Sequence, residues 1–180
     1  MKKKKLITVA IDSPAAAGAG TQAKLIAKSY NLFKLETGMI YRLIGNMRLK
    51  DLKKFNYTLI KKKIKNLKIR ELRNKNLLSD KVAVSASIVA KDKKIRNIVH
   101  KFQQNCAYNP PKKYAGSVLD GRDITSVILK DAMFKFYITA NINVRARRRF
   151  KEYKSLNKAL GFKDVLKSLK KRDISDKNRK

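Results

Sequence analysis

The sequence has one cysteine, one histidine, three prolines and no tryptophan among its 180 residues. The single thiol, Cys106, excludes an intramolecular disulfide and is typical of a reducing compartment, so we expect a cytoplasmic protein. Long apolar runs are lacking as well, because nothing in the sequence approaches the ~20 consecutive apolar residues that span a bilayer. These absences predict a soluble protein without a membrane partner.

The start of the sequence superficially resembles a secretory signal peptide. Lysines at residues 2–5 precede the apolar residues 6–11 and the alanine-rich residues 15–19. Asp12 contradicts that interpretation, because it ends the apolar run after six residues, fewer than the about 7–15 of a signal sequence. A buried strand that enters a loop explains the pattern better.

Acidic residues are scarce: 13 Asp and Glu stand against 46 Lys and Arg, which gives a formal net charge of +33. A charge of this sign favours anionic ligands such as nucleotides, nucleic acids or acidic membrane surfaces. Lysine recurs in nearly every segment from Lys2 to Lys180, whereas nucleic-acid-binding domains usually gather basic residues on one stripe and interleave aromatic ones. A lysine-rich solvated surface is therefore favoured, and nucleic-acid binding is the less favoured alternative.

Hydrophobic residues make up 43% of the sequence, enough for one compact domain with a core. Short apolar runs predict strands at residues 6–11, 117–119 and 134–139. Helical periodicity and helix-forming residues predict helices at residues 21–30, 38–47, 80–90, 93–106, 144–154 and 163–172. Four of these helices follow residues that can cap them: Thr37, Ser79, Asp92 and Asn143. Residues 51–78 show no sharp pattern.

The alternation of strands and helices predicts an α/β fold of three layers, with a central parallel sheet flanked by helices. In such folds, ligands bind at the carboxyl ends of the strands. The residues that follow the predicted strands are therefore the first candidates for a functional site.

The segment Ser13-Pro14-Ala15-Ala16-Ala17-Gly18-Ala19-Gly20-Thr21 follows the first predicted strand and opens the first predicted helix, where a phosphate-binding P-loop would stand. Small residues let backbone N–H groups turn toward phosphates, and the helix N-terminus adds partial positive charge. The pattern G-x-x-x-x-G-K-[GST] fails at Ser13 and Ala19, which replace its first glycine and its lysine. For this segment taken alone, a turn that binds no ligand is the alternative.

Four further segments, in order along the chain, resemble motifs of cytidylate kinases. Residues 36–42 are similar to [ST]-G-x-x-Y-R, and residues 84–90 to A-S-x-V-A. Residues 120–124 match D-G-R-D-[IM], and residues 172–179 reproduce R-D-x-x-D-x-x-R. The resemblance extends over almost the whole chain and implies a P-loop nucleoside monophosphate kinase fold with a monophosphate-binding insert and a lid.

The resemblance also implies a role for each motif residue. The phosphates of ATP would be bound by Ser13, Gly18, Ala19, Gly20, Thr21, Arg145 and Arg148. The monophosphate CMP would be bound by Thr37, Arg42, Ser87, Arg122, Asp123 and Asp176. Catalysis would depend on Asp120, Arg122, Arg172 and Arg179. Magnesium would be held by Thr21, with Asp120 acting through water.

Arginine suits this chemistry, because phosphoryl transfer depends on positioning and charge neutralisation and a planar guanidinium can bind phosphate oxygens bidentately. Ordinary alternatives stay open. Residues 145–149 could form a solvated basic face, and Arg172 with Asp176 could be an i, i+4 helix pair. His100 is expected on a helix surface, because these kinases need no general base.

The resemblance divides the chain into a core at about residues 1–36 and 112–150, a monophosphate-binding region at about 37–111, a lid at about 151–163 and a C-terminal helix at about 163–180. It further implies a final strand and helix after Arg179, which the sequence as given does not contain. An open edge of the sheet is therefore expected.

The implied reaction is phosphoryl transfer from ATP to CMP or dCMP by a monomer, with Mg²⁺ as the cofactor. Ala19 in place of lysine should cost on the order of 3 kcal/mol, or about a hundredfold in rate. Lys24 lies a helical turn further on and replaces it at best in part, and Gln104 stands where relatives usually carry arginine. A degenerate homologue that binds nucleotide with little turnover is the alternative function.

Overall fold

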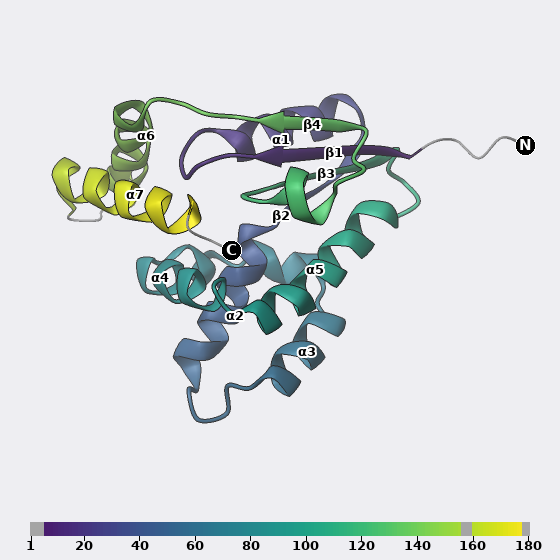
Figure 1. Cartoon of the computed structure of the whole chain (residues 1–180), viewed down its shortest axis with the longest axis horizontal. Helices are drawn as coiled ribbons and strands as arrows, with labels where there is room; N and C mark the ends of the chain where they lie inside the picture. The colour runs from purple at the N-terminus through teal and green to yellow at the C-terminus, as the bar shows by residue number, and fades with distance from the viewer. Residues whose placement is uncertain (1–5, 156–159, 178–180) are drawn as a thin grey trace, which may run out of the picture.

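The computed structural model describes residues 6–155 and 160–177. Its centre is a parallel sheet with the strand order β2-β3-β1-β4 (Figure 1). The strands are β1 (Ile7–Asp12), β2 (Leu32–Glu36), β3 (Gly116–Gly121) and β4 (Phe134–Tyr137). Three of them confirm predicted strands. The sequence pattern misses β2, because Lys34 and Glu36, which form an ion pair at 3.7 Å, interrupt its apolar residues.

The register of the sheet brings three acidic residues to one edge. Asp12 of β1 pairs with Gly121 of β3, and Glu36 of β2 pairs with Asp120 of β3. Because all of these strands run parallel, their carboxyl ends lie at the same edge. This is the edge at which the sequence predicts ligand binding.

The strand β4 forms an outer edge of the sheet, beside β1. All four of its residues are exposed, including Phe134, Phe136 and Tyr137 at 48%, 46% and 71%. Among the residues that the structure describes, no further strand pairs with it. Within the described sheet, β4 is therefore an edge strand.

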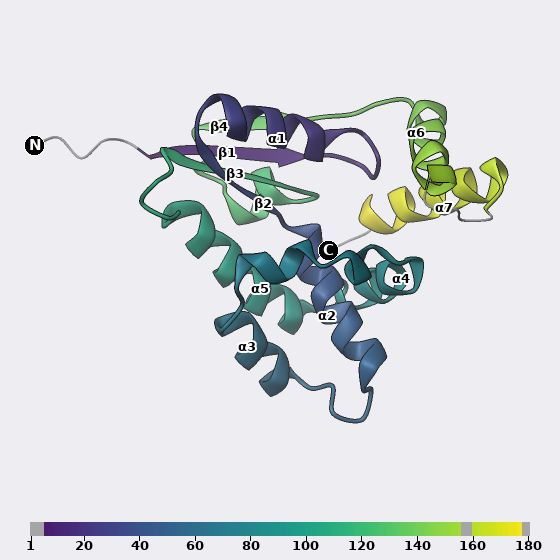
Figure 2. The same ribbon diagram turned by 180° about the vertical axis from the view of Figure 1, so that it is seen from behind.

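Helices cover both faces of the sheet (Figures 1 and 2). On one face lies α1 (Ala19–Ser29), whose Ala23 packs with Val9, Ile11 and Val118. On the other face, α5 (Lys93–Tyr108) contacts β3, and a π-helical turn at Ile124–Ile128 contacts β1 and β3. The predicted three-layer α/β architecture is confirmed.

A group of helices extends from the second face: α2 (Gly38–Lys50), α3 (Tyr57–Lys65), α4 (Asp80–Val89) and α5. The largest apolar cluster joins this group to the sheet, and Leu35, Ile40, Ile44, Val99 and Leu119 belong to it. Within residues 51–78, which the sequence left unassigned, lie α3 and two 3-10 turns at Ile69–Arg73 and Lys75–Leu78.

Two predicted caps in this region are confirmed. The Ser79 hydroxyl accepts from the Val82 N–H at 3.4 Å, at the start of α4. The Asp92 carboxylate accepts from the N–H groups of Lys94 and Ile95 at 2.8 and 3.0 Å, at the start of α5. Both caps satisfy backbone donors that the first turn of a helix leaves free.

A pair of helices, α6 (Ile142–Ser155) and α7 (Phe162–Lys177), lies beyond the carboxyl edge of the sheet (Figures 1 and 2). Both extend beyond their predicted ends. The prediction that Asn143 caps α6 is wrong, because the helix begins at Ile142 and Asn141 accepts from the Asn143 N–H at 2.9 Å. None of the helices in the described residues combines the length and apolar composition needed to cross a membrane.

Candidate active site

The site begins at the loop between β1 and α1. Gly18 has a φ of 102°, a left-handed conformation that favours glycine, and its carbonyl accepts from the Thr21 N–H at 3.1 Å. This reversal turns the chain directly into the first turn of α1. Three alanine side chains of this segment are buried: Ala15, Ala17 and Ala19. The position at which a P-loop lysine would stand is therefore occupied by a buried methyl group.

The end of β3 brings Asp120 against this loop. A Cβ atom on Gly20 would lie 3.8 Å from its Oδ2 atom. Its Oδ1 atom is buried and has no hydrogen-bond partner among the described residues. Burial, together with the charge of nearby Glu36, raises the pKa of Asp120 to about 6. Such a carboxylate gains stability from a cation.

These residues fit a magnesium ion. Mg²⁺ prefers oxygen ligands, usually keeps several waters and is commonly bound through one or two carboxylates and substrate phosphates. The orphaned Asp120 oxygen meets that requirement, and the exposed Thr21 hydroxyl lies in the first turn of α1. No group of three His, Cys, Asp or Glu side chains in residues 6–155 and 160–177 could hold a metal by itself. Substrate phosphates and water would have to complete the coordination.

Asp12, at the end of β1, fixes the turn that follows β3. Its carboxylate accepts from the Ile124 N–H at 2.6 Å, and from the N–H and hydroxyl of Thr125 at 3.0 and 2.5 Å. The Ser13 N–H donates to the Gly121 carbonyl at 3.1 Å, so the two loops are joined a second time. No motif assigns Asp12 a site role, and its place at the end of a buried strand is the one sequence feature that singles it out.

Thr37, at the end of β2, is also bound to β3. Its hydroxyl and its N–H both donate to the Asp120 carbonyl, at 2.8 and 3.1 Å. The predicted side-chain cap of α2 is therefore not formed, because the hydroxyl is engaged elsewhere. A Cβ atom on Gly121 would lie 2.6 Å from the Thr37 hydroxyl oxygen, so this approach requires glycine.

One carboxylate, that of Asp176 on α7, is shared by two arginines. Arg122 Nε donates to its Oδ2 atom at 2.9 Å, and Arg172 Nε lies 4.0 Å from the same oxygen. Burial, together with the charge of Arg122, lowers the pKa of Arg172 to about 10. The structure thus brings Arg122 together with Arg172 and Asp176, which belong to a different motif far along the sequence.

Asp123 forms an ion pair with Arg96 of α5, with Oδ2 and Nη2 2.5 Å apart. Arg96 is a residue that the motifs did not indicate, since it stands in a lysine-rich helix without a distinguishing pattern. The pair therefore links Asp123, at the start of the turn after β3, to α5.

Arg42 and Ser87 lie on neighbouring helices, α2 and α4. Arg42 Nη1 donates to the Leu77 carbonyl at 2.6 Å. Burial and the charge of Arg149 lower its pKa. The Ser87 hydroxyl donates within its own helix, to the Val84 carbonyl at 2.7 Å. Ser85 joins the two helices, because its hydroxyl donates to the Gly45 carbonyl at 2.9 Å.

Two arginines of α6 contact the loop after β1. Arg145 is buried, and its Nη1 atom donates to the Ala15 carbonyl and to Asp173 of α7, both at 3.1 Å. Its Nη2 atom donates to the other Asp173 oxygen at 2.6 Å, which completes a bidentate pair. Arg148, one turn later, donates through Nη1 to the Ala17 carbonyl at 3.1 Å.

Arg149 is a further cation that the motifs did not indicate. Its Nη1 atom lies 2.9 Å from Glu152 Oε2, and its guanidinium carbon lies 4.8 Å from the Tyr153 ring centre. Burial of Arg42 and Arg172 is the main cause of the lowered pKa of each, and the charge of Arg149 contributes further to both. Helices α2, α6 and α7 therefore surround one strongly positive region.

Some predicted features fall elsewhere. Arg179 lies outside the described residues, as do residues 156–159 of the expected lid. Gln104, the expected departure from an arginine, donates to the Ile128 carbonyl at 3.0 Å.

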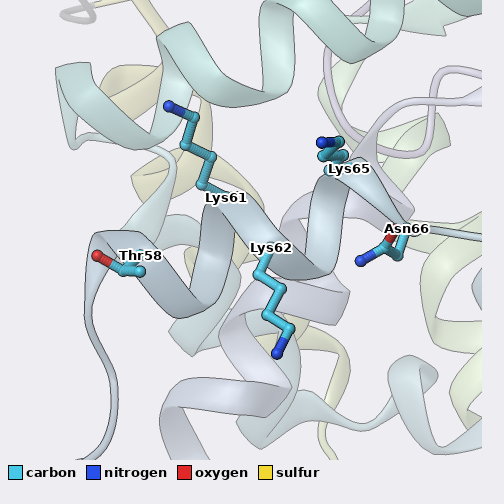
Figure 3. A pocket seen from close by; sticks show the side chains of 5 residues that line it. All are labelled: Thr58, Lys61, Lys62, Lys65 and Asn66. Atoms are coloured by element: carbon cyan, nitrogen blue, oxygen red, sulfur yellow. The ribbon is translucent and has the colours of Figure 1, made fainter.

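Two hollows beside α3 lie away from the carboxyl edge. One of about 340 Å³ is lined by Thr58, Lys61, Lys62, Lys65 and Asn66 of α3 and the residue after it (Figure 3). Lys61 and Lys62 leave the helix in opposite directions (Figure 3), so their charges do not converge on one point. None of the motif residues lines this hollow. The carboxyl edge of the sheet is therefore the better candidate.

Comparison with known proteins agrees with the motifs. The family model described as cytidylate kinase matches residues 9–180. A protein named cytidylate kinase from Clostridium botulinum is 38% identical over 185 aligned residues, which cover 97% of this chain and 83% of the relative. Proteins of the same name from Bartonella tribocorum and Azorhizobium caulinodans are 38% and 37% identical, and the alignments cover 98% and 95% of this chain and 80% and 81% of the relatives.

Proposed function

The chain belongs to the cytidylate kinase family, and on that premise we propose that it transfers the γ-phosphoryl group of ATP to CMP or dCMP. The observation that carries the proposal is the arrangement around Asp120. A P-loop-like turn lies against this carboxylate. At the same edge of the sheet, Arg122 and Arg172 share the single carboxylate of Asp176. Two polyanionic substrates need such a site.

The arginine cluster would bind the monophosphate. Arg42, Arg122 and Arg172 present planar forks for phosphate oxygens, and an anion would relieve the repulsion among them. Asp176 would orient Arg122 and Arg172 toward the CMP phosphate. The family resemblance assigns Arg179 to the same catalytic group.

Asp123 would select the nucleoside. A carboxylate can accept a hydrogen bond from the exocyclic amine of cytosine, and Arg96 holds Asp123 in place for this contact. Thr37, just before α2, and Ser87 of α4 would complete the monophosphate site. The region at about residues 37–111 would thus bind CMP, and the segment at about 151–163 would close over both nucleotides as a lid.

The loop after β1 would bind the phosphates of ATP through backbone N–H groups near Ser13, Gly18, Ala19 and Gly20. Magnesium, held by Thr21 and by Asp120 through water, would neutralise charge on the phosphate oxygens. Arg145 donates to Asp173 and two backbone carbonyls, so we assign it a positioning role in place of the ATP contact that the family resemblance implies.

The transfer itself forms one bond and breaks one bond. An oxygen of the CMP phosphate attacks the γ-phosphorus of ATP. The bond from that phosphorus to the bridging oxygen breaks, and ADP leaves with the electron pair. The protein contributes position and positive charge, and no side chain has to become covalently attached.

The direct test is a coupled assay of ADP release with ATP, Mg²⁺ and each of CMP, dCMP, UMP and AMP. We expect turnover with CMP and dCMP that exceeds turnover with UMP and AMP and stops on addition of EDTA. The matched variant Asp123→Asn should lose most of the preference for cytosine while the protein remains folded by circular dichroism. A folded sample without turnover on any acceptor would contradict the proposal and make a nucleotide-binding role the next one to test.

A further inference from the structure

The loop after β1 contains no cationic side chain, but an arginine of α6 contacts it. Ala19 is only 5% exposed, and no lysine stands between Ser13 and Thr21. The guanidinium of Arg148 reaches the loop from α6, where Nη1 lies 3.1 Å from the Ala17 carbonyl oxygen. The same atom would lie 3.5 Å from a Cβ atom on Gly18. A positive charge therefore stands over the residues that immediately precede the lysine position.

This arrangement is held by the fold and needs no ligand. One turn before Arg148, buried Arg145 joins the Ala15 carbonyl to Asp173. Apolar contacts reinforce this attachment, because Ala15 of the loop, Ala146 of α6 and two residues of α7 form one buried cluster. The helix that carries Arg148 is thus attached to the loop both by the hydrogen bonds of Arg145 and by the apolar contacts of Ala146. A charge positioned in advance is worth more in a transition state than one that must be ordered.

The side chain also retains hydrogen-bonding capacity. A guanidinium has five N–H donors, and the contact with Ala17 uses one of them. Arg148 is exposed, so a phosphate bound on the loop can reach the remaining donors. Lys24, the other cation near the loop in sequence, lies on α1 after its first turn.

We propose that Arg148 supplies to the phosphates of ATP the positive charge that the P-loop itself lacks at Ala19. The inference rests on the proposed phosphoryl transfer. It differs from an ordinary lid contact, because it predicts that Arg148 and a lysine at position 19 replace each other. The effects of changing these two positions should therefore depend on one another.

The test compares the unsubstituted protein with Ala19→Lys, Arg148→Ala, Arg148→Lys and the double variant Ala19→Lys with Arg148→Ala. Arg147→Ala is the matched control, because it removes the same charge from the exposed neighbouring position of α6. Thermal unfolding by circular dichroism establishes that each protein is folded. The rate of ADP formation from ATP and CMP is then measured at saturating substrate.

We expect Arg148→Ala to lower kcat about a hundredfold, as loss of a preorganised electrostatic group does in other enzymes. Arg147→Ala should change it less than about threefold, since exposed charges are strongly screened. Arg148→Lys should keep more activity than Arg148→Ala. Ala19→Lys should raise kcat at least about tenfold in the Arg148→Ala background and by a smaller factor in the unsubstituted protein. Equal factors in both backgrounds, or equal losses in Arg147→Ala and Arg148→Ala, would overturn the proposal.

A second readout separates this proposal from the proposed function. Binding of ADP with aluminium fluoride, Mg²⁺ and CMP, which together imitate the transferring phosphoryl group, is measured by calorimetry. Arg148→Ala should weaken binding at least about tenfold relative to Arg147→Ala. If the unsubstituted protein shows no turnover, the proposed function fails, and this difference in binding still decides the role of Arg148. Equal binding by the two variants would refute that role.

Discussion

Arg145 and Arg172 belong to adjoining helices of the same site, but their surroundings are opposite. Arg145 is buried and donates to Asp173 and to two backbone carbonyls, so its charge is matched within the protein. Arg172 shares Asp176 with Arg122 and stands near two more arginines. In the first arrangement the protein itself neutralises the arginine, whereas in the second a bound anion would relieve the repulsion between arginines. The difference separates an arginine matched within the fold from one that we propose binds substrate.

The largest change in stability is expected for Arg145, the arginine whose charge is matched within the fold. Replacement of Arg145 by alanine should lower the free energy of unfolding by about 4 kcal/mol, because it strands the Asp173 charge in a partly buried place. Urea unfolding measures the loss, and Arg147→Ala on the same helix is the control. A loss below about 1 kcal/mol would contradict the claim that the Arg145–Asp173 pair stabilises the fold.

Replacement of Asp120 should give the next largest change in the free energy of unfolding, and it should stabilise the protein at neutral pH. Its pKa is raised from the ordinary 3.8 to about 6, so the folded protein retains a proton that the unfolded chain has released between these values. The free energy of unfolding therefore falls as pH rises through this interval, by up to about 3 kcal/mol, and stays lowered above it.

Asp120→Asn removes this penalty, so the variant should gain stability over the unsubstituted protein as pH rises from about 4 to about 7. Urea unfolding of both proteins across that range isolates the Asp120 contribution from those of the other acids. A stability difference that does not change with pH would contradict the assignment. Turnover should fall in the same variant, because the carboxylate proposed to act on magnesium is lost.

A smaller effect is expected where the shared acid is removed. Asp176→Asn should lower the free energy of unfolding by about 1.5 kcal/mol, because Arg122 and Arg172 lose their common partner. Inorganic phosphate should raise the melting temperature of this variant more than that of the unsubstituted protein, since an anion replaces the lost charge. Equal shifts in both proteins would mean that the cluster does not need an anion.

The smallest effect is expected far from the site. Lys61→Ala on α3 should change the free energy of unfolding by less than about 0.5 kcal/mol and leave the Michaelis constant for CMP unaltered, because Lys61 is an exposed residue of the open hollow. The urea and kinetic measurements used above check both parts. A marked rise in the Michaelis constant would show that the lysines of α3 take part in substrate capture.

The sequence predicted the architecture better than the contacts within the site. Apolar runs and helix caps are local signals, so β1, β3, α4 and α5 could be placed from neighbouring residues alone. The strand β2 could not, because its Lys34 and Glu36 face each other at a sheet edge that only the folded chain creates. The same holds for the start of α6, where two asparagines compete as caps and only the structure selects Asn141.

The motifs indicated which residues gather at the carboxyl edge, but not which groups bind one another. Thr37 is a plausible cap in sequence, yet its hydroxyl donates to a carbonyl 83 residues away. Asp12 and Arg96 gave no motif signal, because each acts on a partner more than 25 residues away in the chain. Pairings of this kind depend on the sheet register and on helix packing, which residue patterns specify only indirectly.

The exposed edge of β4 has a consequence for the behaviour of the protein in solution. Within residues 6–155 and 160–177 no strand pairs with its outer side, so its aromatic residues and backbone groups are able to pair with the same strand of a second molecule. The net charge of +33 opposes that approach, because each copy repels the next. Salt weakens the repulsion, since the screening length shrinks from about 10 Å at 0.1 M to about 3 Å at 1 M. Turbidity should therefore appear on adding salt and disappear on dilution, the reverse of what is expected for a complex held together by opposite charges.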